Sequence, residues 1–299
     1  MQNFQGILLM IAAMAGFALG DVGIKLLTQT VPLSQIIVTF GGVGTALLAL
    51  ATLRSGQPLL PAALANRAVA SRYCAEITAT LFMSNALALV PLSLLTAILQ
   101  AGPLMVALGA VVFFGESVSW RRWCAICIGL IGVLVILRPG GEGFDLAALL
   151  PVGAMLALAA RDLSTRAAPG TLTNLQLATL GFSAFIVAGC LQLPFYGRWI
   201  MPDLREIGFF ALAIVPSIMA YYAITAAMRV GEISVVTPFR YARLIFGLTL
   251  GAVLFGERID GWMLVGGALV VGSGIYTVLR ERAARRAALA GLEPARRAL

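Results

Sequence analysis

The sequence predicts an all-α integral membrane protein with ten transmembrane helices, built as two five-helix repeats of inverted topology. Three observations predict this fold class: the composition, the number of long apolar segments, and a fixed offset at which the second half repeats the first. Of the 299 residues, 60% are hydrophobic and 11% are charged. Because soluble domains carry about 25% charged residues, we expect this chain to lie in a lipid bilayer.

Ten apolar segments follow one another along the chain. A membrane-spanning helix needs about 20 mostly apolar residues, and the fifth and sixth segments are the shortest of the ten. The predicted segments are 5–27, 34–53, 73–90, 94–114, 123–137, 146–161, 173–193, 208–228, 235–255 and 261–279. No connection between them is long enough to form a soluble domain.

The N-terminal stretch MQNFQ has no basic residue, so we expect the first segment to be a retained helix and not a cleaved signal peptide.

In the first half, the segments are separated by residues that interrupt helices. The fourth segment ends at Gly115-Glu116, where glycine is expected to end one helix and the carboxylate to cap the next. The other breaks are Val31-Pro32, Ser55-Gly56, Val90-Pro91 and Arg138-Pro139-Gly140.

The second half has helix-ending residues of the same kinds. Pro169-Gly170 separates the sixth and seventh segments, and Gly256-Glu257 ends the ninth as Gly115-Glu116 ends the fourth. The basic tail RERAARRAALAGLEPARRAL follows Leu279 and is expected to be a frayed helix or disordered. Small residues on the fifth and tenth segments predict close helix packing, or alternatively a dimer interface: Gly129, Gly132, Gly266, Gly267, Gly272 and Gly274.

The two halves align without a gap when 141 is subtracted from the later residue numbers. Residues 234–257 fall on 93–116, and Asp162 falls on Asp21. The sequence therefore predicts a first five-helix repeat over 1–140, a second over 141–281, and a basic cytoplasmic tail over 282–299. Since five is odd, the second repeat enters the membrane from the opposite side, which makes the repeat inverted.

Basic residues are unevenly divided between the two faces of the membrane. The predicted face opposite the N-terminus has five: Lys25, Arg138, Arg198, Arg205 and Arg258. The N-terminal face and the tail have fourteen: Arg54, Arg67, Arg72, Arg121, Arg122, Arg161, Arg166, Arg229, Arg280, Arg282, Arg285, Arg286, Arg296 and Arg297. Cytoplasmic loops carry the excess of Lys and Arg, so both termini are predicted to be cytoplasmic.

Arg240 and Arg243 lie inside the ninth segment and have no charged counterpart in the fourth, where Leu99 and Gly102 occupy the matching positions. At 1.5 Å per residue they lie about 8 Å and 12 Å inside the start of the helix. Intramembrane charges are expensive, which favours a functional role in binding an anionic group. The alternative is that the arginines snorkel to the cytoplasmic face. Tyr241 between them is a candidate for stacking on an aromatic substrate.

Asp21 and Lys25 are one helical turn apart, so their side chains can pair. The offset repeats the pattern as Asp162 and Arg166 at the other membrane face. The structural interpretation is an ion pair that offsets desolvation, and the functional one is a gate at each mouth or proton coupling at Asp21. A separate salt bridge is expected between Arg72 and Glu76.

Several classes of function have no support in the sequence. There is no G-x4-G-K-[S/T] pattern, so ATP hydrolysis through a P-loop is excluded. The net charge of +8 is placed in loops and the tail, where it sets topology and does not indicate nucleic acid binding. Cys124-x2-Cys127 is isolated in a chain without histidine, so all four cysteines are interpreted as small apolar helix residues. We expect no metal or other cofactor.

The repeat, its two Gly-Glu helix ends and the small-residue helices that follow them resemble the drug/metabolite transporter superfamily, with two EamA-type repeats. Within it the chain looks most like bacterial exporters of amino acids and related metabolites, aromatic ones included. The resemblance implies a central cavity between the halves, alternating access, and a bacterial inner-membrane location. It also implies that the third and fourth helices line the cavity, which adds Met83, Asn85 and Gln100 as candidate binding residues. Tyr222 is a further candidate, with membrane-interface anchoring as the alternative.

The function predicted from these residues is secondary export of amino acids or similar small amphipathic metabolites. The expected partners are a small-molecule substrate and the lipid bilayer, with the protein a monomer or homodimer. The alternatives are another substrate class of the same superfamily, a channel, or a membrane-embedded enzyme acting on lipid. The sequence contains no histidine or serine–base arrangement that would support catalysis.

Overall fold

The computed structural model describes residues 2–115, 120–139, 145–196, 199–230 and 233–297, and all of its regular structure over these ranges is helical. The first part contains α1 (Gln2–Leu27), α2 (Leu33–Arg54), η1 (Ala62–Leu64), α3 (Arg67–Leu89), α4 (Leu92–Leu99), α5 (Gly102–Phe114) and α6 (Trp120–Leu137). The second contains η2 (Leu146–Leu149), α7 (Leu150–Ala167), α8 (Asn174–Gln192), α9 (Leu204–Val230), α10 (Ile233–Val236), η3 (Thr237–Tyr241), α11 (Ala242–Phe255) and α12 (Gly261–Arg297).

Eight helical stretches of the described chain are long and apolar enough to cross a membrane: Asn3–Leu27, Leu33–Arg54, Leu92–Phe114, Leu146–Ala167, Asn174–Gln192, Leu204–Met228, Thr237–Phe255 and Gly261–Arg280. A shorter apolar helix covers Trp123–Leu137. The third predicted segment falls on α3, which is outside this set. Its first three turns carry Arg67, Arg72 and Glu76, which lower its hydropathy.

Two of the predicted segments are broken helices. The stretch 94–114 divides into α4 and α5 around Gln100 and Ala101, and 235–255 divides into α10, η3 and α11. Proline near the first turn of α5 and of η3 removes a backbone donor and favours such a break. The breaks meet in space, because Nε2 of Gln100 donates to the carbonyl of Tyr241 at 3.2 Å.

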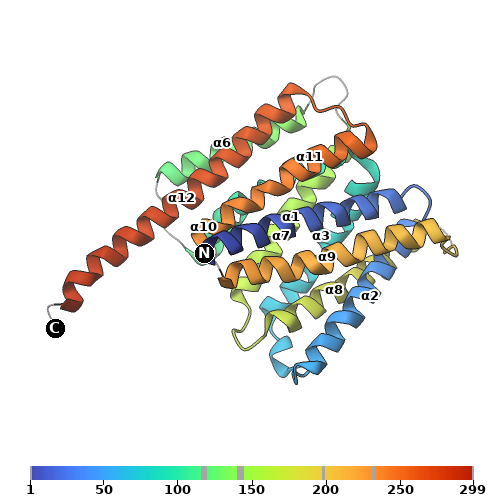
Figure 1. Ribbon diagram of the computed structural model, residues 1–299, viewed down its shortest axis with the longest axis horizontal. Coiled ribbons are helices and arrows are strands. Elements are labelled where there is room, and N and C mark those ends of the chain that lie inside the picture. The colour runs from blue at the N-terminus through green and yellow to red at the C-terminus, as the bar shows by residue number, and fades with distance from the viewer. Residues whose placement is uncertain (1, 116–119, 140–144, 197–198, 231–232, 298–299) are drawn as a thin grey trace.

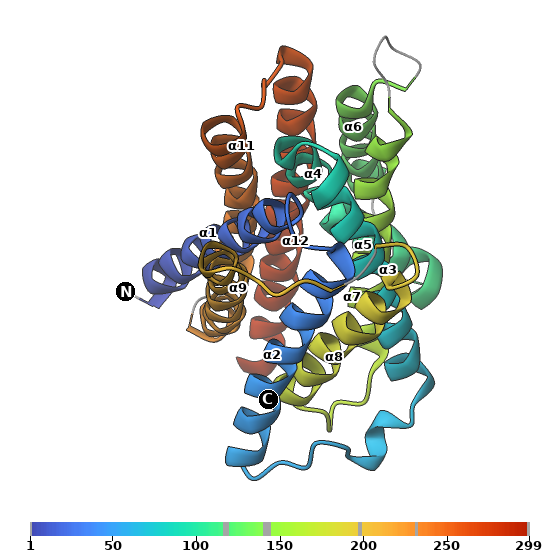
Figure 2. The same ribbon diagram turned by 90° about the vertical axis from the view of Figure 1, so that its right-hand side faces the viewer.

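The helices pack mainly as four pairs: α1 with α9, α2 with α8, α3 with α7, and α6 with α12 (Figures 1 and 2). Glycine permits the close approach in two of them. A Cβ at Gly23 of α1 would lie 2.5 Å from the backbone nitrogen of Ala213 in α9. A Cβ at Gly132 of α6 would lie 2.8 Å from the carbonyl oxygen of Gly266 in α12. Small residues allow membrane helices to pack backbone to backbone in this way.

The glycines predicted to end helices do so in the left-handed conformation, with φ of 65° at Gly115 and 63° at Gly256. The prediction that Glu257 caps the helix that follows it was wrong. Its carboxylate instead accepts the backbone N–H groups of Leu92 at 2.6 Å and Ser93 at 2.8 Å, so it caps α4 in the other half. Glu116, predicted to act in the same way, lies outside the described residues.

Asp260 takes the capping role at α12 that was expected of Glu257. Its Oδ1 accepts the backbone N–H of Met263 at 2.8 Å, and its carboxylate pairs with Arg138. The Met263 hydrogen bond and the Arg138 guanidinium hold the pKa of Asp260 below its usual range. The helix that begins here continues through Arg297, well beyond the apolar segment, so the basic tail is helical over most of its length.

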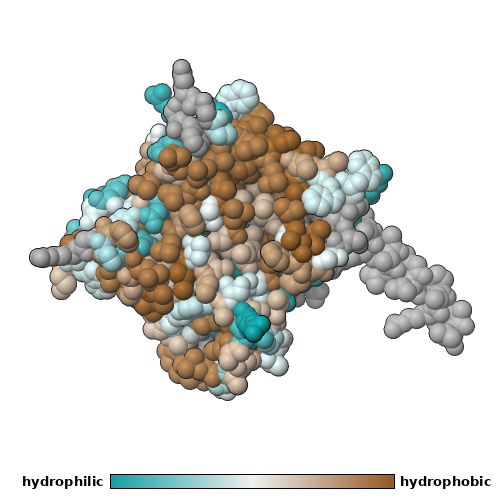
Figure 3. Space-filling model, turned by 180° about the vertical axis from the view of Figure 1, so that it is seen from behind, coloured by the Kyte–Doolittle hydropathy of each residue, from teal (hydrophilic) through white to brown (hydrophobic). Residues whose placement is uncertain are grey.

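Large apolar side chains cover much of the outer surface (Figure 3). Among the most exposed are Val112 at 68%, Phe113 at 75% and Val253 at 74%. Such an apolar exterior is the surface expected against hydrocarbon chains. With eight spanning stretches, it identifies a multi-pass membrane protein.

Candidate functional site

A cavity of about 850 Å³ lies inside the helix bundle. Its walls come from both halves of the chain, principally α1, α3, α5, α7, α8, α9, η3 and α12, with Arg243 from α11. Four arginines line it, namely Arg161, Arg166, Arg240 and Arg243. Three carboxylates line it as well: Asp21, Glu76 and Asp162. Four cations against three anions give the described lining a formal charge of +1.

Arg243 is neutralised by Asp21. Its Nη2 donates to Oδ2 of Asp21 at 2.6 Å, and its Cζ lies 5.6 Å from the centroid of the Phe17 ring. The ion pair joins α11 to α1, and the Asp21 residue is only 7% exposed. Burying a charge is tolerated where a partner of opposite charge is within hydrogen-bond distance.

The predicted pairing of Asp21 with Lys25 is therefore replaced by two other contacts. Lys25 is not among the described lining residues, and its ammonium donates to the carbonyls of Leu87 at 3.3 Å and Val90 at 2.6 Å. It also lies 3.9 Å from the carboxylate of Glu257. Spacing of one turn made the Asp21–Lys25 pair possible, but partners on neighbouring helices offered better geometry to both groups.

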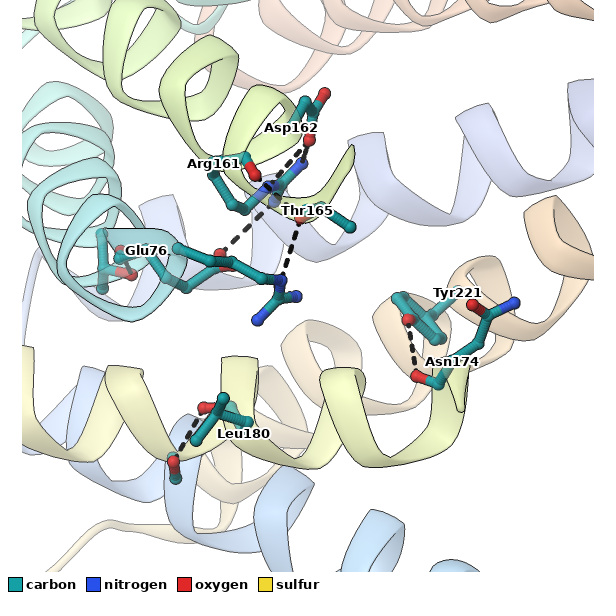
Figure 4. A network of polar contacts seen from close by, with 10 residues as sticks. Glu76, Arg161, Asp162, Thr165, Asn174, Leu180 and Tyr221 are labelled. Atoms are coloured by element: carbon teal, nitrogen blue, oxygen red, sulfur yellow. Dashed lines mark hydrogen bonds and ion pairs between the residues drawn. The ribbon is translucent and has the colours of Figure 1, made fainter. Parts of the chain in front are cut away.

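A second charged network centres on Arg161 (Figure 4). Its Nη2 lies 2.8 Å from Oδ1 of Asp162, and its Nη1 lies 3.3 Å from Oε1 of Glu76. The predicted salt bridge between Arg72 and Glu76 is confirmed at 3.8 Å, and Nε of Arg72 also donates to Thr165. From the sequence, Arg161 lies at the end of a predicted segment and was interpreted only as a sign of membrane topology. Its position in the cavity wall was therefore not predicted.

Arg166 was predicted to pair with Asp162. The structure shows its guanidinium carbon 4.9 Å from the centroid of the Phe114 ring, while Asp162 forms its ion pair with Arg161. Arg166 nevertheless lines the cavity, as Asp162 does.

Arg240 differs from the other cavity arginines. It makes no hydrogen bond or ion pair with any part of the chain that the structure describes, although Asp162 is near enough to interact with it electrostatically. The residue is exposed and is part of the cavity lining. A guanidinium in this position is available to an anionic group that enters.

Aromatic rings form another part of the wall. Phe40, Phe182 and Phe185 are in mutual contact, with centroid separations of 5.6 Å, 5.3 Å and 5.5 Å. All three line the cavity, and they join α2 to α8. Such a cluster offers an apolar surface and ring edges to a planar ligand. The sequence did not single these rings out, because isolated phenylalanines in apolar segments carry no distinguishing pattern.

The remaining predicted binding residues divide into two groups. Tyr241, Gln100 and Met83 line the cavity. Tyr241 is 6% exposed, and its hydroxyl has no hydrogen-bond partner among the described residues. Asn85 and Tyr222 are not in the described lining: Asn85 bonds to the hydroxyl of Tyr196, and Tyr222 is 76% exposed.

Sites of other kinds are not evident in the described residues. They include no group of three or more histidine, cysteine or acidic side chains placed to hold a metal ion. The four cysteines are free thiols on exposed positions.

These features describe a multi-pass helical membrane protein with a charged and aromatic internal cavity. Comparison with known proteins agrees: residues 4–138 match the model of the EamA-like transporter family.

Individual relatives are transporters. Riboflavin transporters of Rhizobium johnstonii and Vibrio cholerae are 28% and 32% identical over 65% and 58% of this chain, and the chain spans only 64% and 58% of their lengths. An S-adenosylmethionine uptake transporter of Rickettsia conorii is 26% identical over 66% of this chain and 67% of its own. The pseudopaline exporter CntI of Pseudomonas aeruginosa is 24% identical over 89% of this chain and 93% of its own.

A crystal structure of another protein shares the fold. It covers 94% of this chain and 99% of that one, with a TM-score of 0.58 and 20% sequence identity. The likeness extends through both halves of the chain.

Proposed function

We propose that the protein is a secondary transporter of the drug/metabolite transporter superfamily. Its substrate is a small amphipathic metabolite with an anionic group and a planar apolar part, such as an aromatic amino acid. The observation that carries this proposal is the presence, in one cavity, of the Phe40–Phe182–Phe185 cluster and of Arg240, whose guanidinium has no hydrogen bond or ion pair within the described chain. An arginine fork binds a carboxylate bidentately, and the rings accept a flat apolar group.

Export is the direction we propose. A relative that matches across nearly its whole length is named as an exporter, whereas the S-adenosylmethionine uptake transporter of Rickettsia conorii matches over about two thirds of its own. An amino acid exporter is the specific form of this proposal, and a different metabolite of the same chemical character is the alternative.

We also propose that the chain forms ten spanning helices in two inverted five-helix halves around this cavity. The helix pairs support it. With the offset of 141, α1 corresponds to α7 and α3 to α9, so the α1–α9 pair corresponds to the α7–α3 pair. In the α2–α8 and α6–α12 pairs, each helix packs against its own counterpart in the other half. The residues at the crossing of the broken helices, Gln100 and Tyr241, are themselves 141 apart and bond to each other. An inverted repeat of this kind is the basis of alternating access.

The test is transport into proteoliposomes of a labelled panel: an aromatic amino acid, an aliphatic one, riboflavin and S-adenosylmethionine, each with and without a proton gradient. We expect saturable transport of an amphipathic, carboxylate-bearing compound. Arg240→Leu should raise KM for that compound by about 10- to 100-fold, as expected for loss of a charge-assisted hydrogen bond. Arg240→Lys should fall between the two, because it retains the charge and loses the fork.

Arg54→Leu, which changes an exposed arginine at the end of α2, is the matched control and should leave KM unchanged. Unaltered transport by Arg240→Leu would remove Arg240 from the binding site. Flux that does not saturate would favour a channel.

A further inference from the structure

A second concave site lies on the outside of the bundle, between α6 and α12. These helices pack side by side along one edge of the molecule (Figure 1). The groove has a volume of about 490 Å³, and none of its lining residues belongs to the central cavity. Its floor consists of small and apolar residues: Cys124, Ala125 and Ile128 from α6, and Ala268, Leu269 and Gly272 from α12.

Gly272 keeps this groove open. Two other glycines of the α6–α12 contact are close to the facing helix, since a Cβ at Gly129 would lie 2.7 Å from Oγ of Ser273 and one at Gly266 2.6 Å from the Gly132 carbonyl oxygen. At Gly272 a Cβ would meet nothing within 4 Å. The helix interior prefers other residues to glycine by up to about 1 kcal/mol. Helix packing therefore does not explain glycine at position 272. The open groove beside this position explains it, because a side chain there would fill the groove.

One end of the groove is amphipathic and positively charged. Trp120 and Tyr276 line it and are 70% and 43% exposed, and Arg121 lies with its Cζ 5.6 Å from the Trp120 ring centroid. Arg280 is exposed and follows Tyr276 by one turn, which places it on the same face of α12. Tryptophan and tyrosine favour the level of the lipid headgroups, and arginines just beyond it attract anionic lipid.

The dimensions of the groove suit an acyl chain. The groove lining on α12 runs from Ala268 to Tyr276, a rise of about 12 Å, and Arg280 follows about 6 Å further along the helix. The apolar floor, the aromatic side chains and the arginine together therefore extend over about 18 Å, close to the depth of one leaflet. Further arginines at 282, 285 and 286 continue this basic end of the sequence.

We propose that this groove is a binding site for one anionic phospholipid of the arginine-rich leaflet. Its phosphate is held by Arg121 and Arg280, and one acyl chain lies along Gly272 between α6 and α12. Small residues would also suit a second copy of this chain as the occupant. The positive charge of Arg121 and Arg280 complements a lipid phosphate, and this favours the lipid.

The test uses the full-length protein in detergent, titrated with phosphatidylglycerol or with zwitterionic phosphatidylcholine and monitored by native mass spectrometry. The unaltered protein should retain one phosphatidylglycerol in preference to phosphatidylcholine. Arg121→Gln and Arg280→Gln should each lower the affinity for phosphatidylglycerol by about fivefold. Gly272→Leu fills the groove and should abolish retention of either lipid at this site.

Matched controls separate the site from general surface effects. Arg54→Gln removes an exposed arginine at the end of α2, and Gly42→Leu adds the same side chain at another helix glycine with nothing within 4 Å. Both should bind phosphatidylglycerol like the unaltered protein. The proposal is overturned if Gly272→Leu and Gly42→Leu retain equal amounts, if the two lipids bind equally, or if the protein is a dimer that Gly272→Leu dissociates.

Discussion

Arg240 and Arg243 are three residues apart on one broken helix, yet their surroundings give them different chemistry. Arg243 already has a carboxylate partner, Asp21, at 2.6 Å, whereas Arg240 makes no such contact within the described chain. The sequence identified both as costly charges without a counterpart in the first half. It could not separate them, because the partner of Arg243 is 222 residues away.

This difference changes what is expected of substitutions at Arg243. From the sequence alone, Arg243→Leu should leave folding intact or improve it, since it removes a charge from the membrane. With Asp21 buried against the guanidinium, the same change leaves an unpaired carboxylate and should destabilise the protein by about 3–5 kcal/mol.

The measurement is a double-mutant cycle on thermal unfolding in detergent, with Asp21→Asn, Arg243→Leu and both together. The double variant should be more stable than Arg243→Leu alone, because neither buried charge remains. Additive losses from the two single changes would show that the ion pair does not couple these residues.

At the scale of the helices, the apolar segments could be located from the sequence, and their helix-ending glycines were identified correctly. The breaks within the fourth and ninth segments were not predicted, because apolar residues continue on both sides of Gln100 and of Arg240. Only the prolines at 103 and 238 mark these breaks in the sequence. The partner of Glu257 was also unpredictable. The sequence around a capping carboxylate is the same whether it caps the next helix or a helix 165 residues away.

Close packing of helices gives a prediction with a built-in control. Tyr241 lies against Gly274 of α12, where an added Cβ would come within 1.7 Å of the tyrosine hydroxyl oxygen. Gly274→Ala should therefore destabilise the protein by about 1–3 kcal/mol, as overpacking of a core does. Gly272→Ala lies on the same helix facing open space and should be neutral or stabilising by up to about 1 kcal/mol.

Thermal unfolding of the two alanine variants, side by side, makes the comparison. If Gly274→Ala is as stable as Gly272→Ala, Tyr241 moves freely, and its place in the cavity wall is not fixed by α12.

For the molecule as a whole, the excess of arginine on one predicted face predicts that both termini lie in the cytoplasm. A reporter active only in the periplasm, fused after Leu299, should therefore be silent, and one active only in the cytoplasm should be active. The reverse result would require an odd number of spans or the opposite orientation.

We expect one end of the cavity to be closed by an apolar core. Near Ile24 and Leu87 the lining meets a large apolar core that includes Leu27, Val90 and Leu92, all buried. Lys25 reinforces this end from within the first half, through the carbonyls of Leu87 and Val90.

Glu257, whose side chain is 9% exposed, connects the two halves at this end through α4 and Lys25. Opening here by relative movement of the halves must break its contacts, so Glu257→Gln, which loses the charge, should favour the open state. A cysteine at Ile24, in a chain whose native cysteines are replaced by serine, should then react several-fold faster with a membrane-impermeant maleimide added on the Glu257 side. Glu206→Gln is the matched control, because Glu206 also bonds a backbone N–H near a helix start, that of Asp203, but within one half. Equal labelling of the two variants would show that the halves do not separate at Glu257, and that access to the cavity follows another route.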